Sequence, residues 1–359
     1  MALSQVGLER LGTSVTDKIG ENKNLIINGA MQVAARGTSF TVSDAYTLDR
    51  YKFKIAGGGA ATITQSSTTP DDFSYSYKVD ITTADTSVAN TDHGVIMHAV
   101  EGYNFAPANF GTSAAKTCKL SFYVRSNKTG TYGVAFQNSA QNRSCIQEYT
   151  INVADTWERK TITVPADTGG SWNTTNGVGL KLTWGLMGGS TYATSTLGSY
   201  NGSNVFLTSN QVNLFDNTSN EWYMTGAQLE IGSVATDFEH RAFLDELRRC
   251  QRYYYMHSEG ADDRMVGVGI SYNSSINIGV VHFPCQMRAV PTMDAPSGTN
   301  FYKCVTNNTT VYQPNCTLED SNINCCGFRF SGANSTTIGT GIYFRLGSAS
   351  AHVAFNAEL

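Results

Sequence analysis

The chain has 359 residues, of which only 15% are charged, and its formal net charge at pH 7 is −4. No run of basic residues suggests nucleic-acid binding, and no stretch of about 18 apolar residues suggests insertion into a membrane. Glycine (34 residues), tyrosine (18) and phenylalanine (17) are abundant, which favours short strands and polar turns over an α/β fold. The length is sufficient for two domains.

Residues 1–22 are predicted to form a short amphipathic helix, with Val6, Leu8, Leu11 and Val15 along one face. A single helix of this length is only marginally stable alone, so we expect it to dock on a partner as an anchor. A disordered terminus is the alternative. The segment lacks the basic and apolar regions of a signal peptide.

Residues 23–240 are predicted to form a first β domain. Strand-like runs follow one another from Asn24–Ile27 to Glu221–Leu229, and glycine-rich turns such as Gly57-Gly58-Gly59 separate them. No helical period lies between the runs, as a βαβ arrangement would require. The pattern favours a two-sheet sandwich of jelly-roll type.

A short helix is predicted to join this domain to the next one. Phe243, Leu244 and Leu247 recur at helical spacing and are expected to form its apolar face. The charged residues of the segment are expected to face solvent: Asp245, Glu246, Arg248 and Arg249.

Residues 241–359, which include this helix, are predicted to form a second β-sandwich, a tip domain. Its strand-like runs extend from Met265–Tyr272 to His352–Ala357. The sequence therefore predicts an all-β chain of two sandwich domains with a short N-terminal helical anchor.

The sequence offers little chemistry. It contains no nucleophile elbow, phosphate-binding loop or zinc-protease motif. His93 and His98 are an odd number of residues apart on a predicted strand, so they point to opposite faces and are not expected to bind one metal. The eight cysteines form no CxxC pair and are expected to be free thiols. We therefore predict no catalytic residues, no metal and no cofactor.

Aromatic residues in polar loops are more suggestive. Trp172, Tyr192 and Tyr200 lie among glycine, serine and asparagine, including Asn173 and Asn201. Sugar rings stack on flat aromatic rings while amide side chains bind their hydroxyls, so these five residues are predicted to bind a glycan at the loop ends of the sandwich. The alternative is that the rings plug the ends of the sandwich or face a neighbouring subunit.

Several segments of the chain resemble, in the same order, a domain that is widespread in bacteriophage fibre and virion proteins. The resemblance begins with NLIINGAMQVAARGTSF and spans residues of about 24–295. The segments that carry it are Asn24–Phe40, Tyr46–Phe53, Val100–Ser126, Glu148–Leu180, Gly226–Tyr255 and Phe283–Met293.

The resemblance implies a jelly roll like that of carbohydrate-binding modules, carried on a tail fibre or related virion appendage. It also implies a homotrimer that attaches to other virion proteins through its N-terminus and presents a C-terminal tip to host-surface polysaccharide. The protein would then be located in the virion, after assembly in the host cytoplasm. The family has no shared catalytic motif that can be placed on this sequence.

Two classes of function follow. The first is a non-enzymatic virion protein, a tail fibre or similar appendage that binds host-surface glycan receptors. A head-decorating structural protein or adaptor without receptor binding is its variant. The second is a glycan depolymerase, which is disfavoured because phage depolymerases usually show a long repeated β-helix that this sequence lacks.

Overall fold

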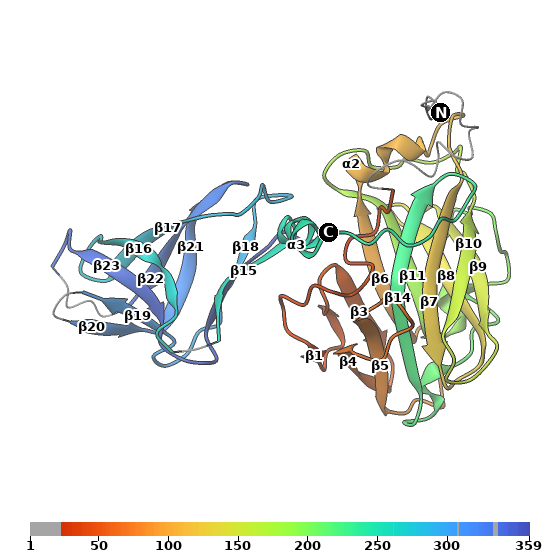
Figure 1. The fold of residues 1–359 in the computed structure, drawn as a ribbon, viewed down its shortest axis with the longest axis horizontal. Coiled ribbons are helices and arrows are strands. Elements are labelled where there is room, and N and C mark those ends of the chain that lie inside the picture. Colours follow the sequence, from red (N-terminus) through yellow and green to blue (C-terminus); the bar gives the residue numbers. More distant parts are fainter. Residues whose placement is uncertain (1–22, 261, 307–308, 333–336) are drawn as a thin grey trace, which may run out of the picture. The chain divides into compact units, whose positions relative to one another are not determined.

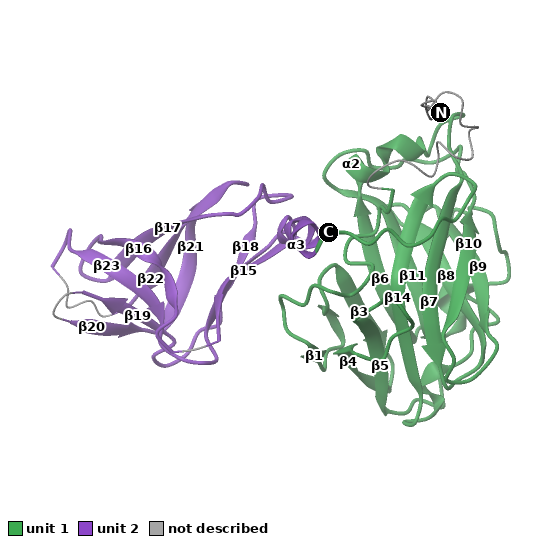
Figure 2. Cartoon of the chain, viewed as in Figure 1, with its two compact units in different colours: residues 1–242 green, residues 243–359 purple. Residues whose placement is uncertain are grey.

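The computed structural model describes residues 23–260, 262–306, 309–332 and 337–359 (Figure 1). The helix predicted over residues 1–22 lies outside them. The chain divides into two compact units between Ala242 and Phe243 (Figure 2). In the described part of the chain, no helix is long and apolar enough to cross a membrane. The predicted all-β class is confirmed, because the described residues form mostly strands in several antiparallel sheets.

The first unit contains two six-stranded antiparallel sheets. One has the order β1-β4-β5-β14-β7-β10. Its strands are β1 (Ser39–Phe40), β4 (Ala60–Ser66), β5 (Ser76–Thr83), β14 (Glu221–Ile231), β7 (Cys118–Ser126) and β10 (Glu158–Val164). The other, which we call sheet B, has the order β2-β3-β6-β11-β8-β9. Its strands are β2 (Asp44–Tyr46), β3 (Tyr51–Ala56), β6 (His93–Glu101), β11 (Val178–Gly188), β8 (Gly130–Gln137) and β9 (Ser144–Ile151).

A single core fills the space between these sheets. In β7, residues two apart such as Leu120, Phe122 and Val124 are fully buried, as the period of a strand requires. Phe122 packs edge-on against Trp184 of β11, with 6.1 Å between ring centroids. Each sheet thus buries one face, and the opposite face of sheet B is left for other contacts.

Short elements lie in the connections between these strands. They are α2 (Gly102–Phe105), η2 (Ala106–Ala108), η3 (Ser190–Tyr192), η4 (Leu214–Asp216) and the parallel pair β12 (Ala193–Thr194) and β13 (Leu207–Thr208). Phe215 of η4 is completely buried. An added Cβ at Gly59 or Gly94 would lie 2.7 or 2.8 Å from its ring. The absence of a side chain at both glycines therefore leaves space for the Phe215 ring.

Residues 24–27 do not form the predicted strand. The amide of Leu25 donates to the carbonyl of Leu229, and the Asn24 side chain accepts from the amides of Ile26 and Leu229. An asparagine side chain that bonds the backbone two residues on favours a turn. The segment is therefore an irregular strip tied to β14.

The second unit has a three-stranded and a seven-stranded sheet, with orders β15-β24-β18 and β20-β19-β23-β16-β17-β22-β21. The smaller sheet comprises β15 (Tyr254–Glu259), β24 (His352–Asn356) and β18 (Thr292–Asp294). The larger comprises β20 (Thr310–Gln313), β19 (Tyr302–Val305), β23 (Gly341–Leu346), β16 (Met265–Ser271), β17 (Ile276–His282), β22 (Cys325–Ser331) and β21 (Asn315–Ser321). Phe328, Phe344 and Phe355 belong to one buried cluster drawn from both sheets.

Helix α3 (Phe243–Gln251) forms as predicted, but its buried face differs from the prediction. Phe243 and Leu244 are 52% and 69% exposed, whereas Glu246 and Cys250 are 7% and 1% exposed. Glu246 and Cys250 are four residues apart and so share one face. The spacing of apolar residues shows which side chains share a face of the helix. It does not show which of the faces packs against the rest of the protein, so the predicted apolar face was wrong.

Candidate functional site

A long connection between β11 and η4 crosses the outward face of sheet B. We call residues 189–212 the strap. The amide of Gly198 donates to the carbonyl of Ile146 on β9 at 2.9 Å. The backbones of Asn201 and Ser144 exchange two hydrogen bonds, at 2.9 and 3.0 Å. The strap is therefore fixed to strands that precede it by more than 40 residues.

Glycines on the outward face make this close approach possible. A Cβ at Gly185 of β11 would lie 2.6 Å from Leu207, and one at Gly133 of β8 would lie 3.1 Å from Thr208. The amide of Gly133 donates to the side-chain oxygen of Gln211 at 2.9 Å. Glycine within a strand often marks a site where another segment approaches closely, and here that segment is the strap.

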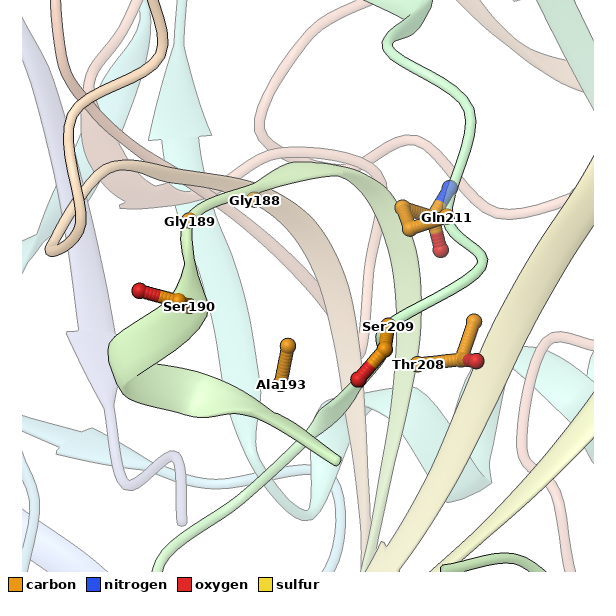
Figure 3. A pocket seen from close by; sticks show the side chains of 7 residues that line it. All are labelled: Gly188, Gly189, Ser190, Ala193, Thr208, Ser209 and Gln211. Carbon is orange, nitrogen blue, oxygen red and sulfur yellow. The ribbon is translucent and has the colours of Figure 1, made fainter. Parts of the chain in front are cut away.

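An open pocket of about 200 Å³ lies between the two ends of the strap. In Figure 3, Gly189 and Ser190 lie on one side of it, and Thr208, Ser209 and Gln211 lie on the other. Its lining consists of Gly188, Gly189, Ser190, Ala193, Thr208, Ser209 and Gln211. This lining presents hydroxyl, amide and backbone groups but no charged side chain.

An aromatic stack lies at the same part of the strap. Tyr192 and Phe206 stack with 4.7 Å between ring centroids and 23° between planes. The imidazole of His93, at the start of β6, meets both rings edge-on at 5.2 and 5.4 Å. Burial lowers the pKa of His93 below its usual value, which favours the neutral ring. Both aromatic rings of the stack are half-buried and so keep part of their surface open.

Three lysines lie on the same outward face of sheet B as the strap. Lys52 of β3 is paired in register with Met97 of β6, and Lys181 of β11 is paired with Ala99. Met97 and Ala99 are alternate residues, so these side chains share one face, and so does Lys54. The lysines thus flank β6 from both sides.

The electrostatics of this lysine group are distinctive. Asp44 of β2 places its two carboxylate oxygens 2.7 Å from Lys52 Nζ and 3.9 Å from Lys54 Nζ. Burial, with the charges of Lys54 and Lys52, lowers the pKa of Lys181 to about 8. A partly buried ammonium beside two like charges favours its neutral form.

The structure places the predicted aromatic residues in two groups. Trp172 is only 8% exposed, and its indole N–H donates to Asp167 Oδ2 and to the carbonyl of Gly169, both at 3.2 Å. Trp172 and Tyr200 meet edge-on at 5.6 Å. Burial raises the pKa of Tyr200 well above its usual value. These rings close one end of the sandwich, so Trp172 offers no open face for a sugar, contrary to the expectation.

The two predicted asparagines take part in turns. Asn173 accepts from the amide and hydroxyl of Thr175, and Asn201 accepts from the amide of Ser203. Such bonds stabilise the loop backbone. Of the five predicted residues, Tyr192 is the one beside the pocket, immediately before Ala193 in its lining. The lysine group was not among the predicted residues, although its alternating positions in KFK could have indicated a shared face.

Several other charged side chains among the described residues form ion pairs within the fold. Arg143 binds the buried carboxylate of Asp167 through two nitrogens, at 2.8 and 2.5 Å. Lys78 Nζ lies 2.6 Å from Glu221. The eight cysteines are free thiols, six of them buried. Within the described ranges, no three histidine, cysteine or acidic residues gather as a metal site.

Neither a protein-family model nor a curated protein matches the sequence. Among solved structures, the chain is similar to the enzymatically active domain of tailspike protein 4 of bacteriophage CBA120 (11% identity, TM-score 0.32, covering 58% of this chain and 21% of that one). It is similar to a CBM4 protein (12% identity, TM-score 0.31, covering 57% and 99%). It is also similar to the family 11 carbohydrate-binding module of Clostridium thermocellum (10% identity, TM-score 0.29, covering 55% and 98%). The chain thus spans about a fifth of the tailspike chain that it matches. These scores transfer no residue role.

Proposed function

We propose that this chain is a non-enzymatic, glycan-binding structural protein of a bacteriophage virion, a tail fibre or similar appendage. The observation that supports glycan binding is the pocket formed by the strap, with the Tyr192–Phe206 stack in the same segment. Hydroxyl and amide groups bind sugar hydroxyls, and the face of an aromatic ring receives the apolar face of a sugar ring. An open pocket of about 200 Å³ suits one or two sugars of a long surface polysaccharide.

A binding role is favoured over turnover by the state of the carboxylates. Hydrolysis of a glycosidic bond usually requires two carboxyl groups that face each other across the bond. Asp167 and Glu221 are instead held by Arg143 and Lys78. On the strap side, Glu148 accepts from the Thr208 hydroxyl and from Asn210 Nδ2, so it serves to fix the strap.

We expect Ser209→Trp to weaken glycan binding strongly. The exposed Ser209 lines the pocket, and an indole there would fill it, so affinity should fall at least about tenfold. The matched control is Ser67→Trp, at an exposed position after β4 in the other sheet. Binding is measured on an array of bacterial surface polysaccharides with the full chain. Equal binding by wild type and Ser209→Trp would place the ligand elsewhere, and release of reducing ends from a bound polysaccharide would show an enzyme.

The location in the virion is supported by the sequence resemblance over residues of about 24–295. In this proposal residues 1–22 attach the chain to other virion proteins, three copies assemble, and the second unit points toward the host. Three copies would multiply a weak contact through avidity. The protein would be assembled in the host cytoplasm and then reside in the virion.

Deletion of residues 1–22 is expected to prevent incorporation into particles while leaving the folded units and their glycan binding intact. Incorporation is measured by immunoblotting of purified particles after complementation with the truncated chain. A chain with Lys116→Gln, a change remote from residues 1–22 in sequence, serves as the control for expression. Normal incorporation of the truncated chain would refute the anchor.

A further inference from the structure

We propose that the outward face of sheet B binds an acidic glycan, whose carboxylate, sulfate or phosphate groups pair with Lys52, Lys54 and Lys181. This inference rests on the proposed function and specifies the class of sugar. The strap pocket and the lysine group lie on this same outward face, and β11 contributes Gly188 to the pocket and Lys181 to the lysine group.

The positive charge of the lysine group is only partly neutralised. Asp44 contacts Lys52 at 2.7 Å and lies 3.9 Å from Lys54. The ammonium group of Lys181 makes no hydrogen bond or ion pair with any described residue. Three cations therefore face one carboxylate, and an anionic ligand would offset the remaining charge.

Polar groups beside Lys181 also have unused bonding capacity. Gln137 of β8 is paired in register with Lys181 of β11. Thr183 lies on β11 two residues after Lys181, on the same face. Both side chains are almost fully buried, at 0% and 1% exposure. Gln137 Oε1 and Thr183 Oγ1 find no hydrogen-bond partner in the described part of the chain. Buried polar atoms are nearly always bonded, so these two oxygens mark a polar layer beneath the face, next to Lys181.

The charge of Lys181 depends on pH in an accessible range. Burial and the two neighbouring lysines lower the pKa of Lys181 to about 8, so the ammonium is charged at pH 7 and largely neutral at pH 9. Other titratable groups on the strands of this face include Lys52 and Lys54 from β3, Asp44 from β2, His93 and Glu101 from β6 and Glu148 from β9. His93, whose pKa is lowered by burial, is already neutral at pH 7. Affinity for an anion should therefore fall as the pH rises from 7 to 9.

The test measures binding of the full chain to defined polysaccharides by calorimetry. Polygalacturonate supplies carboxylates, dextran sulfate supplies sulfate esters, poly(ribitol phosphate) supplies phosphates, and dextran is neutral. We expect Lys181→Gln and the double variant Lys52→Gln/Lys54→Gln each to weaken acidic binding about tenfold. Lys116→Gln, which removes the same charge from a loop before β7, should leave affinity unchanged. Asp44→Asn should strengthen binding, an effect that a purely structural role would not produce.

The pH and salt dependence complete the test. Wild-type affinity should fall between pH 7 and pH 9, and Lys181→Gln should lose this dependence. Raising NaCl from about 50 mM to about 300 mM should weaken acidic binding and leave any neutral binding unchanged. The acid that binds most tightly identifies the source of the charge.

Equal binding of dextran and the three acidic polymers, or insensitivity to the lysine variants, would overturn this inference. Tighter binding of duplex DNA than of any acidic polymer would also overturn it, because the face would then recognise charge and not sugar. Binding to neutral glycans that Ser209→Trp weakens would preserve the proposed function while refuting its acidic form. Absence of binding to any glycan would refute both.

Discussion

Gly189→Ala is expected to detach the start of the strap and to weaken glycan binding. A Cβ at this position would lie 2.0 Å from the carbonyl oxygen of Ala89 and 2.5 Å from that of Asn90. These are backbone atoms that cannot rotate away. The backbone of Gly189 has φ −87° and ψ 172°, which alanine adopts readily, so the entire effect comes from the clash. Overpacking of this kind typically costs about 1–3 kcal/mol.

The clash also bears on two hydrogen bonds that hold the strap. The amide of Gly189 donates to the carbonyl of Asp92 at 2.8 Å, and the amide of Thr191 donates to that of Asn90 at 2.9 Å. Gly189 lines the pocket, so its displacement should reduce glycan affinity about tenfold or more. Thermal unfolding and binding are measured on the same sample.

Gly202→Ala is the matched control, because Gly202 lies in the same strap and an added Cβ there meets no atom within 4 Å. Its stability should change by less than about 0.5 kcal/mol, and its binding should be unchanged. Wild-type behaviour of Gly189→Ala would mean that the strap does not seat on the Ala89–Asp92 loop as described.

Phe215→Ala is expected to destabilise the first unit by about 3–5 kcal/mol. The ring is completely buried and occupies the space beside Gly59 and Gly94. Neither glycine has a side chain that could move into the cavity. The backbone contacts of residue 215 to Asp85 and to Asn213 survive the substitution, so the loss reports the packing of the ring.

Phe206→Ala separates stability from binding. Phe206 is only partly buried and stacks on Tyr192, so its loss should cost about 1 kcal/mol and weaken glycan binding strongly. Phe215→Ala should do the reverse, with a large loss of stability and normal affinity below its unfolding temperature. Unfolding is followed by denaturant titration. Equal destabilisation by both variants would contradict the role of the buried Phe215 ring in packing the first unit.

The regular strands could be predicted from the sequence because their signal is local. Lys119–Val124 alternates clearly, and β7 spans Cys118–Ser126. Strand β21 (Asn315–Ser321) is not among the predicted runs, since in NCTLEDS only Cys316 and Leu318 alternate as apolar residues before three polar ones, and the strand lies at the edge of its sheet, paired with β22 alone. Alternation of apolar and polar residues along the sequence identifies half-buried strands. A largely exposed edge strand forms because it pairs with the neighbouring strand, which its own sequence does not reveal.

The candidate site could not be predicted in the same way. Trp172 lies in a glycine-rich loop that appears open in the sequence, yet its indole N–H meets Asp167 and its ring fills the sandwich end. The position of the strap depends on the packing of Leu207 against Gly185 and of Thr208 against Gly133. No local period in the sequence reveals such long-range packing. The glycines inside two predicted strands were the available signal.

In the strap, the residues that hold it on the sheet differ from the residues that face solvent. Leu207 and Thr208 point toward the sheet and are buried, whereas Ser190, Ser203 and Ser209 are exposed. Substitutions at these exposed positions leave the buried contacts of Leu207 and Thr208 intact and remove only the hydrogen bond from the Ser190 hydroxyl to Asn90, so the sequence of the outer surface can change at little cost to folding. A library confined to these three positions should consequently contain mostly folded members, which makes the strap a natural place to redirect the protein toward a different ligand.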